Sequence, residues 1–129
     1  MAQIKIYGHG EFLRAEHARI SELVHAAAQR TLQLPPDKRF QRFLPLEPWQ
    51  FVAPPDRSPR YLILEVILFT GRSLAVRKAL IRALMDDLSQ GLGLSTNDVE
   101  VTLLESPREN WGIRGQHGDE MVLNYKVEV

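Results

Sequence analysis

The stretch YLILEVILF at residues 61–69, followed at once by TGRS at residues 70–73, decides the fold of this chain. The stretch is apolar and rich in branched side chains, and it lies between a proline-rich segment and Gly71, which is typical of a central sheet strand. A buried helix is the rival interpretation, but the run is short and Gly71 ends it. The sequence therefore predicts a strand, a turn, and a helix that begins after Ser73 as its N-cap.

The two faces of this strand differ in one charged group. Alternation places Leu62, Leu64, Val66 and Leu68 on a purely apolar face, which we expect helices to cover. The other face is apolar apart from Glu65, so it too must be hidden from water. Glu65 is interpreted either as an acid with a raised pKa or, preferably, as a carboxylate paired with Arg or Lys across an interface.

Length and composition exclude several classes of protein. A chain of 129 residues predicts one compact domain over residues 1–129. The 16 basic and 16 acidic residues cancel, which argues against a nucleic-acid or anionic-membrane partner. The chain has no cysteine, which excludes disulfides, thiolate metal sites and a cysteine nucleophile. The N-terminus lacks a signal-peptide pattern and no apolar run is long enough to span a membrane, so we expect a soluble, cytoplasmic protein.

The remaining chain reads as alternating strands and helices. The pattern predicts a strand at residues 2–7, a helix from Glu11 to about Gln33, a short strand at residues 39–43 and an extended connection at residues 44–60. The second helix should end near Gly91 or Gly93, with a buried stripe formed by Leu74, Ile81, Leu84, Met85, Leu88 and Leu92. A strand at residues 99–103 follows, and residues 122–129 suggest a short terminal strand or hairpin arm.

The two halves of the chain match each other. Each half is a strand, a glycine-marked turn, a helix and a second strand, and at one offset Gly10, Ile20 and Leu23 meet Gly71, Ile81 and Leu84. This predicts an α+β fold of duplicated β-α-β units, with one shared sheet and both helices on one face. The face that bears Glu65 then has no helix to cover it. We therefore expect a closed homo-oligomer whose sheets face inward.

Few residues stand out as chemical groups. No histidine has a partner at metal-ligand spacing, so no metal site is predicted, and His17 and His25 read as solvated residues on a polar helix face. Arg72 follows a central strand beside a helix start, where open sheets place anion sites, although a surface charge is an equal alternative. Trp111 lies in a glycine-flanked turn, where its ring either staples the loop or walls a pocket.

Three motifs resemble one known family: FTGRSL at residues 69–74, PPDKRFQ at residues 35–41 and PRENWGIRG at residues 107–115. They are similar to motifs of the tautomerase superfamily, in particular the group around malonate semialdehyde decarboxylase, and the resemblance covers essentially the whole chain. It implies two β-α-β units, a homotrimer with inner sheets and outer helices, and a small active site near each N-terminus.

The resemblance also implies roles for individual residues. The family uses an N-terminal proline whose amine acts as base or acid, and here Ala2 follows Met1 instead. Arginines bind the substrate carboxylate, which implies this role for Arg72 and, as a second candidate, Arg39. Asp37 is implied as a further substrate-binding residue, because it lies next to Lys38, which stands where the decarboxylase has an aspartate. Trp111 is implied to bind substrate as a wall of the pocket.

The sequence leaves two functional hypotheses. The first is a trimeric, tautomerase-like enzyme that acts on small 2-oxo or enol carboxylates through the N-terminal amine, with Ala2 and Arg72 in the catalytic site and no metal or cofactor. The alternative is a non-catalytic trimer that binds a small anion or serves as a structural protein.

Overall fold

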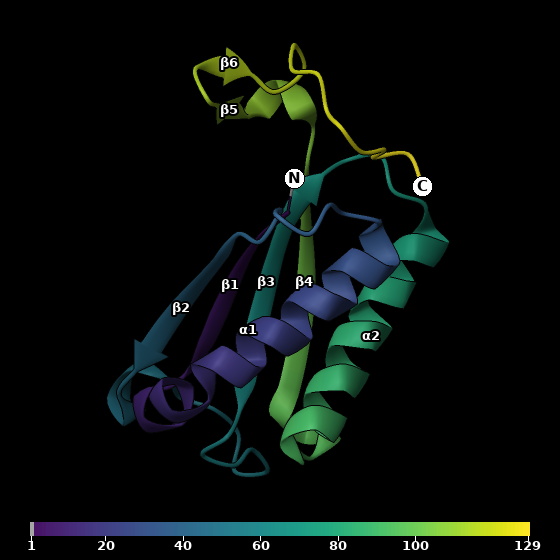
Figure 1. Ribbon diagram of the computed structural model, residues 1–129. Coiled ribbons are helices and arrows are strands. Elements are labelled where there is room, and N and C mark those ends of the chain that lie inside the picture. The colour runs from purple at the N-terminus through teal and green to yellow at the C-terminus, as the bar shows by residue number, and fades with distance from the viewer. Residues whose placement is uncertain (1) are drawn as a thin grey trace.

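The computed structural model describes residues 2–129, and its two β-α-β units follow one another along the chain (Figure 1). The helices and strands are β1 (Ala2–His9), α1 (Gly10–Leu32), β2 (Gln41–Leu46), η1 (Pro48–Gln50), β3 (Leu62–Phe69), α2 (Leu74–Leu92), η2 (Thr96–Asp98), β4 (Val99–Ser106), η3 (Arg108–Asn110), β5 (Gly112–Ile113) and β6 (Gln116–His117).

The main sheet has four strands in the order β2-β1-β3-β4. Strands pair in parallel within each unit, β1 with β2 and β3 with β4, whereas β1 and β3 pair antiparallel at the centre. Ala2 lies opposite Leu68, so the start of β1 adjoins the end of β3. The predicted duplication of a β-α-β unit in one shared sheet is therefore confirmed.

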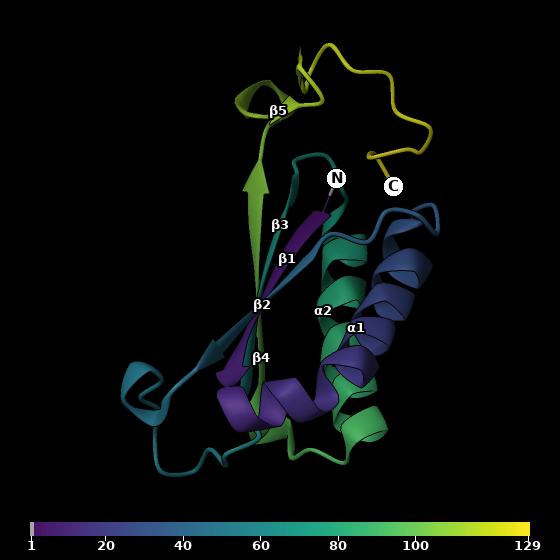
Figure 2. The same cartoon turned by 60° about the vertical axis from the view of Figure 1, so that its left-hand side comes forward.

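Both helices cover the same face of the sheet (Figure 2). The side chains of β3 that point toward them, Leu62, Leu64, Val66 and Leu68, are fully buried. They pack in one apolar cluster with α1 and α2, and burying each such side chain stabilises the fold by about 1.5–3 kcal/mol. In the part of the chain that the structure describes, no helix covers the other sheet face.

The buried stripe of α2 differs from the prediction. Leu74 is 57% exposed and Ile81 is half-buried, while Leu80 and Ala83 are buried. The helices in fact match one position earlier than the sequence alignment indicated, so that Ile20 corresponds to Leu80. Because one residue turns a helix by about 100°, this shift moves Leu74 and Ile81 away from the core. Ser73 does cap the helix, accepting a hydrogen bond from the Val76 amide at 3.2 Å.

Two other expectations in the first unit are corrected. The short strand spans Gln41–Leu46 instead of residues 39–43, and it includes Pro45. Proline is tolerated there because β2 is an edge strand, which pairs only with β1 among the described residues.

His25 was predicted to be solvated, but it is 5% exposed and its Nε2 donates to the Pro36 carbonyl at 2.9 Å. It is therefore a buried residue that fixes the turn after α1.

Glu65 has a partner within its own chain. The Tyr7 hydroxyl donates to Glu65 Oε1 at 2.6 Å, from the neighbouring strand β1. This hydrogen bond raises the pKa of Tyr7 above its usual value. Within its own chain the partner of Glu65 is thus a tyrosine on the uncovered sheet face, and the pairing with Arg or Lys across an interface stays a prediction.

The C-terminal region forms no strand after residue 117, so the predicted terminal strand is wrong. The chain instead makes a β5–β6 hairpin whose two turn residues, Arg114 and Gly115, have positive φ angles of 52° and 76°, as a tight hairpin turn requires. An irregular tail follows and returns to the start of α2, where the Ser73 amide donates to the Val129 carbonyl at 3.2 Å. The hairpin and tail lie beyond the sheet end where β1 begins (Figure 1).

A candidate active site at the start of β1

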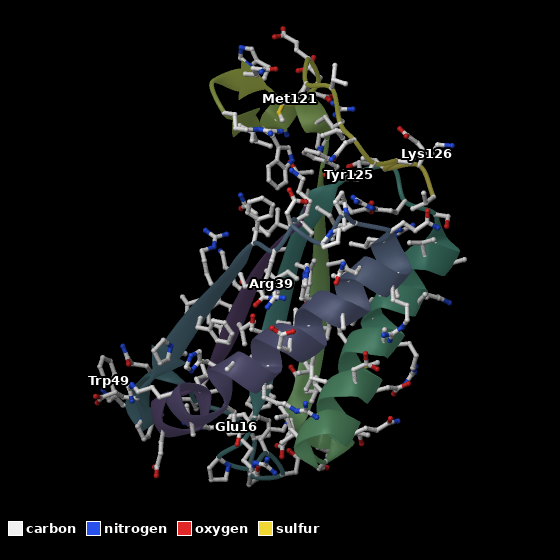
Figure 3. All side chains as sticks on the ribbon, in the orientation of Figure 1. Glu16, Arg39, Trp49, Met121, Tyr125 and Lys126 are labelled. Carbon is white, nitrogen blue, oxygen red and sulfur yellow. The ribbon has the colours of Figure 1, made fainter. Side chains whose placement is uncertain are left out.

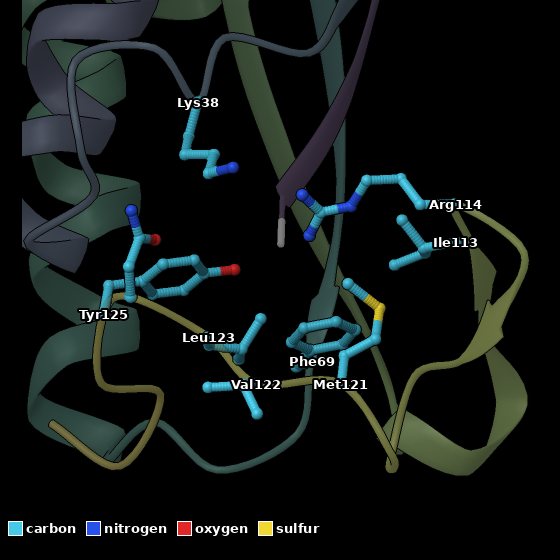
Figure 4. Close-up of a pocket in the computed structure, with 9 residues that line it drawn as sticks. Lys38, Phe69, Ile113, Arg114, Met121, Val122, Leu123 and Tyr125 are labelled. Carbon is cyan, nitrogen blue, oxygen red and sulfur yellow. The ribbon is translucent and has the colours of Figure 1, made fainter.

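A cavity of about 80 Å³ lies at this sheet end, and the start of β1 points toward it (Figure 4). Its walls come from the α1–β2 connection, the end of β3, the hairpin and the tail. The lining residues are Lys38, Phe69, Ile113, Arg114, Met121, Val122, Leu123, Asn124 and Tyr125.

Three polar side chains converge inside the cavity. The Lys38 ammonium, the Arg114 guanidinium and the Tyr125 hydroxyl all point toward the start of β1 (Figure 4). Among the described residues that line the cavity, none is Asp or Glu. Two cations and a phenol without a balancing carboxylate form a site suited to a small organic anion.

The floor of the cavity is apolar and rigidly supported. Phe69 is fully buried, and the Trp111 ring meets it edge-on with the ring centroids 5.0 Å apart. Trp111 Nε1 donates to the Ser106 carbonyl at 3.3 Å, and the Arg108 guanidinium lies 5.6 Å from the centre of the Phe69 ring. Trp111 therefore packs behind Phe69 and does not line the cavity. Its hydrogen bond to Ser106 fixes the turn against the end of β4.

Arg72 also lies behind the wall. It is 4% exposed, and its Nη1 donates to the Phe69 carbonyl at 3.3 Å. Its Nε and Nη2 have no hydrogen-bond partner among the described residues. Burial lowers the pKa of the Arg72 guanidinium, and the nearby Tyr125, Glu105 and Glu128 only partly oppose that effect. Arg72 is thus a strongly desolvated cation adjacent to the site.

Two of the predicted substrate-binding residues are not in the cavity. Arg39 is exposed and engaged elsewhere, donating to Glu22 at 2.9 Å and to Ser21 at 3.3 Å. Figure 3 shows it well away from Tyr125 and Met121. Asp37 is exposed and does not line the cavity, whereas the next residue, Lys38, does.

Ala2 is not among the residues that line the cavity, and its predicted catalytic role stays a prediction. It is buried at 5% exposure, and it is the first residue of β1, whose start points toward the cavity (Figure 4). The expectation about Met1 lies outside the described residues.

Sequence reasoning missed Lys38, Arg114 and Tyr125 as members of one site. Lys38 and Arg114 belong to the motifs that suggested the family, and Lys38 stands in the place of an aspartate, so a signal was present for both. Tyr125 lies in the segment that was predicted as a terminal strand or hairpin arm, and only the irregular path of the tail brings it to the cavity.

Other parts of the molecule have less distinctive chemistry. A larger cleft of about 1060 Å³ lies at the other end of β1, among prolines, arginines and aromatic rings around His9 and Phe51. Within residues 2–129 no group of three or more His, Asp or Glu side chains could hold a metal ion, and no helix is long and apolar enough to cross a membrane.

Comparison with solved structures shows the same fold in several tautomerase-type proteins. Malonate semialdehyde decarboxylase superposes with a TM-score of 0.79 at 21% identity, covering 89% of this chain and 93% of that one. A fused 4-OT, solved as an asymmetric trimer, gives a TM-score of 0.81 at 18% identity, covering 91% and 96%. A member of the cis-3-chloroacrylic acid dehalogenase family gives 0.78 at 16%, covering 89% and 82%.

Sequence comparison identifies the family. The 2-hydroxymuconate tautomerase of Pseudomonas putida is 33% identical over 57 residues, which make up 44% of this chain and 90% of that protein. The sequence model of the tautomerase enzyme family matches residues 38–114, more than half of the chain and including Lys38, Arg72, Trp111 and Arg114. With the fold and the sequence in agreement, this chain belongs to the tautomerase enzyme family.

Proposed function

We propose that this protein is a tautomerase that interconverts the enol and keto forms of small 2-oxo carboxylates. The observation that carries the proposal is the convergence of Lys38, Arg114 and Tyr125 on the start of β1, in a cavity lined by no described carboxylate. The two cations bind the substrate carboxylate, and the apolar floor at Phe69 packs against its carbon chain. Arg72 adds positive charge from behind the wall.

The proposed base is the N-terminal amine at the start of β1. An α-amino group has a pKa near 7.7–8.0, so about one in seven such amines is a free base at pH 7, against about one lysine in several thousand. Proton transfer between carbon and oxygen requires only a positioned base and acid, so the proposal includes no metal or cofactor. The relative named for 2-hydroxymuconate supports this class of substrate.

Removal of Met1 decides where that amine lies. Each residue advances an extended chain by about 3.3–3.6 Å, so one additional residue moves the amine by more than the length of a hydrogen bond. We therefore propose that the Ala2 form is the active one, with the amine at the first residue of β1.

A second candidate function is anion binding without turnover. It is favoured by Ala2, because a primary amine stands where the resemblance implies the secondary amine of a proline. The same cations would bind a small carboxylate whether or not a proton is transferred. Both candidates place the ligand in the same cavity, so a rate measurement separates them.

The test compares three forms of the protein with phenylenolpyruvate or 2-hydroxymuconate as substrate. We expect low or absent ketonisation by the Met1 form, measurable ketonisation by the Ala2 form, and a higher rate for Ala2→Pro. Mass spectrometry of each preparation verifies its N-terminus, and the rate in buffer alone is subtracted. Equal measurable rates from all three forms would rule out the amine as catalyst, and no rate above that of buffer from any form would favour the binding protein.

A further inference from the structure

Arg108, the first residue of η3, connects three walls of the cavity without lining it. Its Nε donates to the Gly118 carbonyl at 2.9 Å, just after the hairpin, and its Nη2 donates to the Met121 carbonyl at 2.6 Å, in the tail. Its guanidinium also lies over the Phe69 ring at the end of β3, 5.6 Å from the ring centre. One planar cation thus holds the hairpin, the tail and the cavity floor together.

The placement of the site depends on these three segments. Every residue that lines the cavity, except Lys38, lies in the hairpin, in the tail or at Phe69. Lys38 comes from the α1–β2 connection and Arg114 from the hairpin, so the separation of the two cations depends on how the hairpin is held. A guanidinium donates N–H groups in fixed directions within one plane, so two bonds from it fix orientation as well as distance.

We propose that Arg108 is a positioning residue of this site, which sets the affinity for a small carboxylate by holding Arg114 and the tail in place. This inference rests on the proposed function, because it takes the cavity to be the ligand site. Other contacts remain when Arg108 is replaced. The Gly118 amide still donates to the Trp111 carbonyl at 2.8 Å, and the far end of the tail still bonds to the start of α2. Loss of Arg108 should therefore loosen the cavity walls and leave the core intact.

Arg60 offers a matched comparison near the start of β3, at the other end of that strand from Phe69. Its Nη2 donates to the Leu92 carbonyl at 2.6 Å and its Nη1 to the Gly93 carbonyl at 3.4 Å. Its guanidinium lies 5.3 Å from the centre of the Phe12 ring. Arg60 and Arg108 thus each hold two backbone carbonyls and one phenyl ring, but only the partners of Arg108 belong to the cavity walls.

The first test measures the affinity for oxalate, a small carboxylate that cannot tautomerise, by calorimetry. Arg108→Met should weaken oxalate binding at least about tenfold, whereas Arg60→Met should leave it within about twofold of wild type. Urea unfolding should show a similar loss of stability in both variants, because each loses the same kind of contacts.

Arg108→Lys separates positioning from charge. Lysine retains the positive charge but not the planar set of donors, so this variant should bind oxalate as weakly as Arg108→Met, within about threefold. Wild-type affinity in Arg108→Lys would assign the effect to charge and overturn the proposal. Equal weakening in Arg60→Met, or no oxalate binding by the wild-type protein, would overturn it as well.

The second test follows the tail directly and needs no ligand. Lys126 is exposed and the next residue, Val127, is buried, so trypsin can cut after Lys126 only when the tail leaves the domain. This cleavage should become at least about tenfold faster in Arg108→Met and stay within about twofold of wild type in Arg60→Met. Unchanged cleavage in Arg108→Met overturns the proposal. An Ala2 form that ketonises no substrate but shows both differences would refute the proposed function and retain the role of Arg108.

Discussion

A buried guanidinium with unpartnered N–H groups costs folding free energy, and Arg72 is such a group. Its Nε and Nη2 lack hydrogen-bond partners among the described residues, although the side chain is almost wholly buried. An unsatisfied polar group of this kind is destabilising unless it gains a hydrogen-bond partner. We propose that Arg72 serves the adjacent cavity through its positive charge.

Arg72→Met should separate stability from binding. Methionine fills a similar volume without a buried charge, so we expect the free energy of unfolding in urea to rise by about 1–3 kcal/mol. Binding of a 2-oxo acid should weaken about tenfold, because a cation near the cavity is lost. Arg82→Met, at an exposed arginine of α2, is the control and should change neither quantity appreciably. A less stable Arg72→Met protein would contradict this explanation.

The turn that carries Trp111 depends on one close approach. A Cβ atom at Gly118 would lie 2.4 Å from the Arg108 carbonyl oxygen and 2.9 Å from Trp111 Cβ. The Gly118 amide also donates to the Trp111 carbonyl at 2.8 Å, which closes the hairpin against η3. Any larger residue must therefore push the hairpin away from the cavity floor.

Gly118→Ala should destabilise the protein by about 1–3 kcal/mol, because the added methyl group meets backbone atoms that cannot move aside cheaply. Gly112→Ala is the matched control, since a Cβ there would meet nothing within 4 Å, and its effect should stay within about 0.5 kcal/mol. Urea unfolding measures both variants. Equal stabilities would show that the hairpin shifts without strain.

Sequence patterns predicted the elements whose burial is regular. β3 was predicted within one residue, because a central strand covered by helices repeats its apolar side chains at every second position. β2 was placed two residues early, since an edge strand that includes Pro45 has a weak pattern. The tail could not be predicted, because it is held by hydrogen bonds to carbonyls and not by a periodic apolar face.

The candidate site was predicted only in part for a related reason. Neighbouring residues in a turn point in different directions. The motif therefore located the turn, but it could not show that Lys38 lines the cavity and Asp37 does not. Arg72 was identified as a cation near an anion site, but its burial behind Phe69 depends on the backbone path through Gly71, whose φ is 140°. The sequence alone does not predict this backbone path, which depends on the fold.

At the scale of the whole molecule, the uncovered sheet face indicates self-association. It carries Ile63 and Ile67 on β3 and the Tyr7–Glu65 hydrogen bond between two strands. Half-buried apolar side chains on a broad face are typical of a surface that a second copy covers. A related fold, the fused 4-OT, was solved as a trimer, and we propose a homotrimer here as well.

Ile67→Lys should dissociate this assembly. A lysine at the centre of the face would bury a charge in each copy, so we expect light scattering to report the mass of one chain in place of three at micromolar concentration. Ala79→Lys, on the exposed side of α2, is the control and should leave the mass unchanged. A wild-type protein that already scatters as a single chain would refute the trimer.

The two tryptophans lie in different environments, so the intrinsic fluorescence of the protein can distinguish them. Trp49 is 75% exposed on η1, at the opposite end of the molecule from the hairpin (Figure 3), whereas Trp111 packs against the cavity floor. Their emission should therefore divide into a water-facing and a shielded component. With Trp49→Phe the remaining indole becomes a single optical probe, one ring away from any ligand that enters beside Phe69.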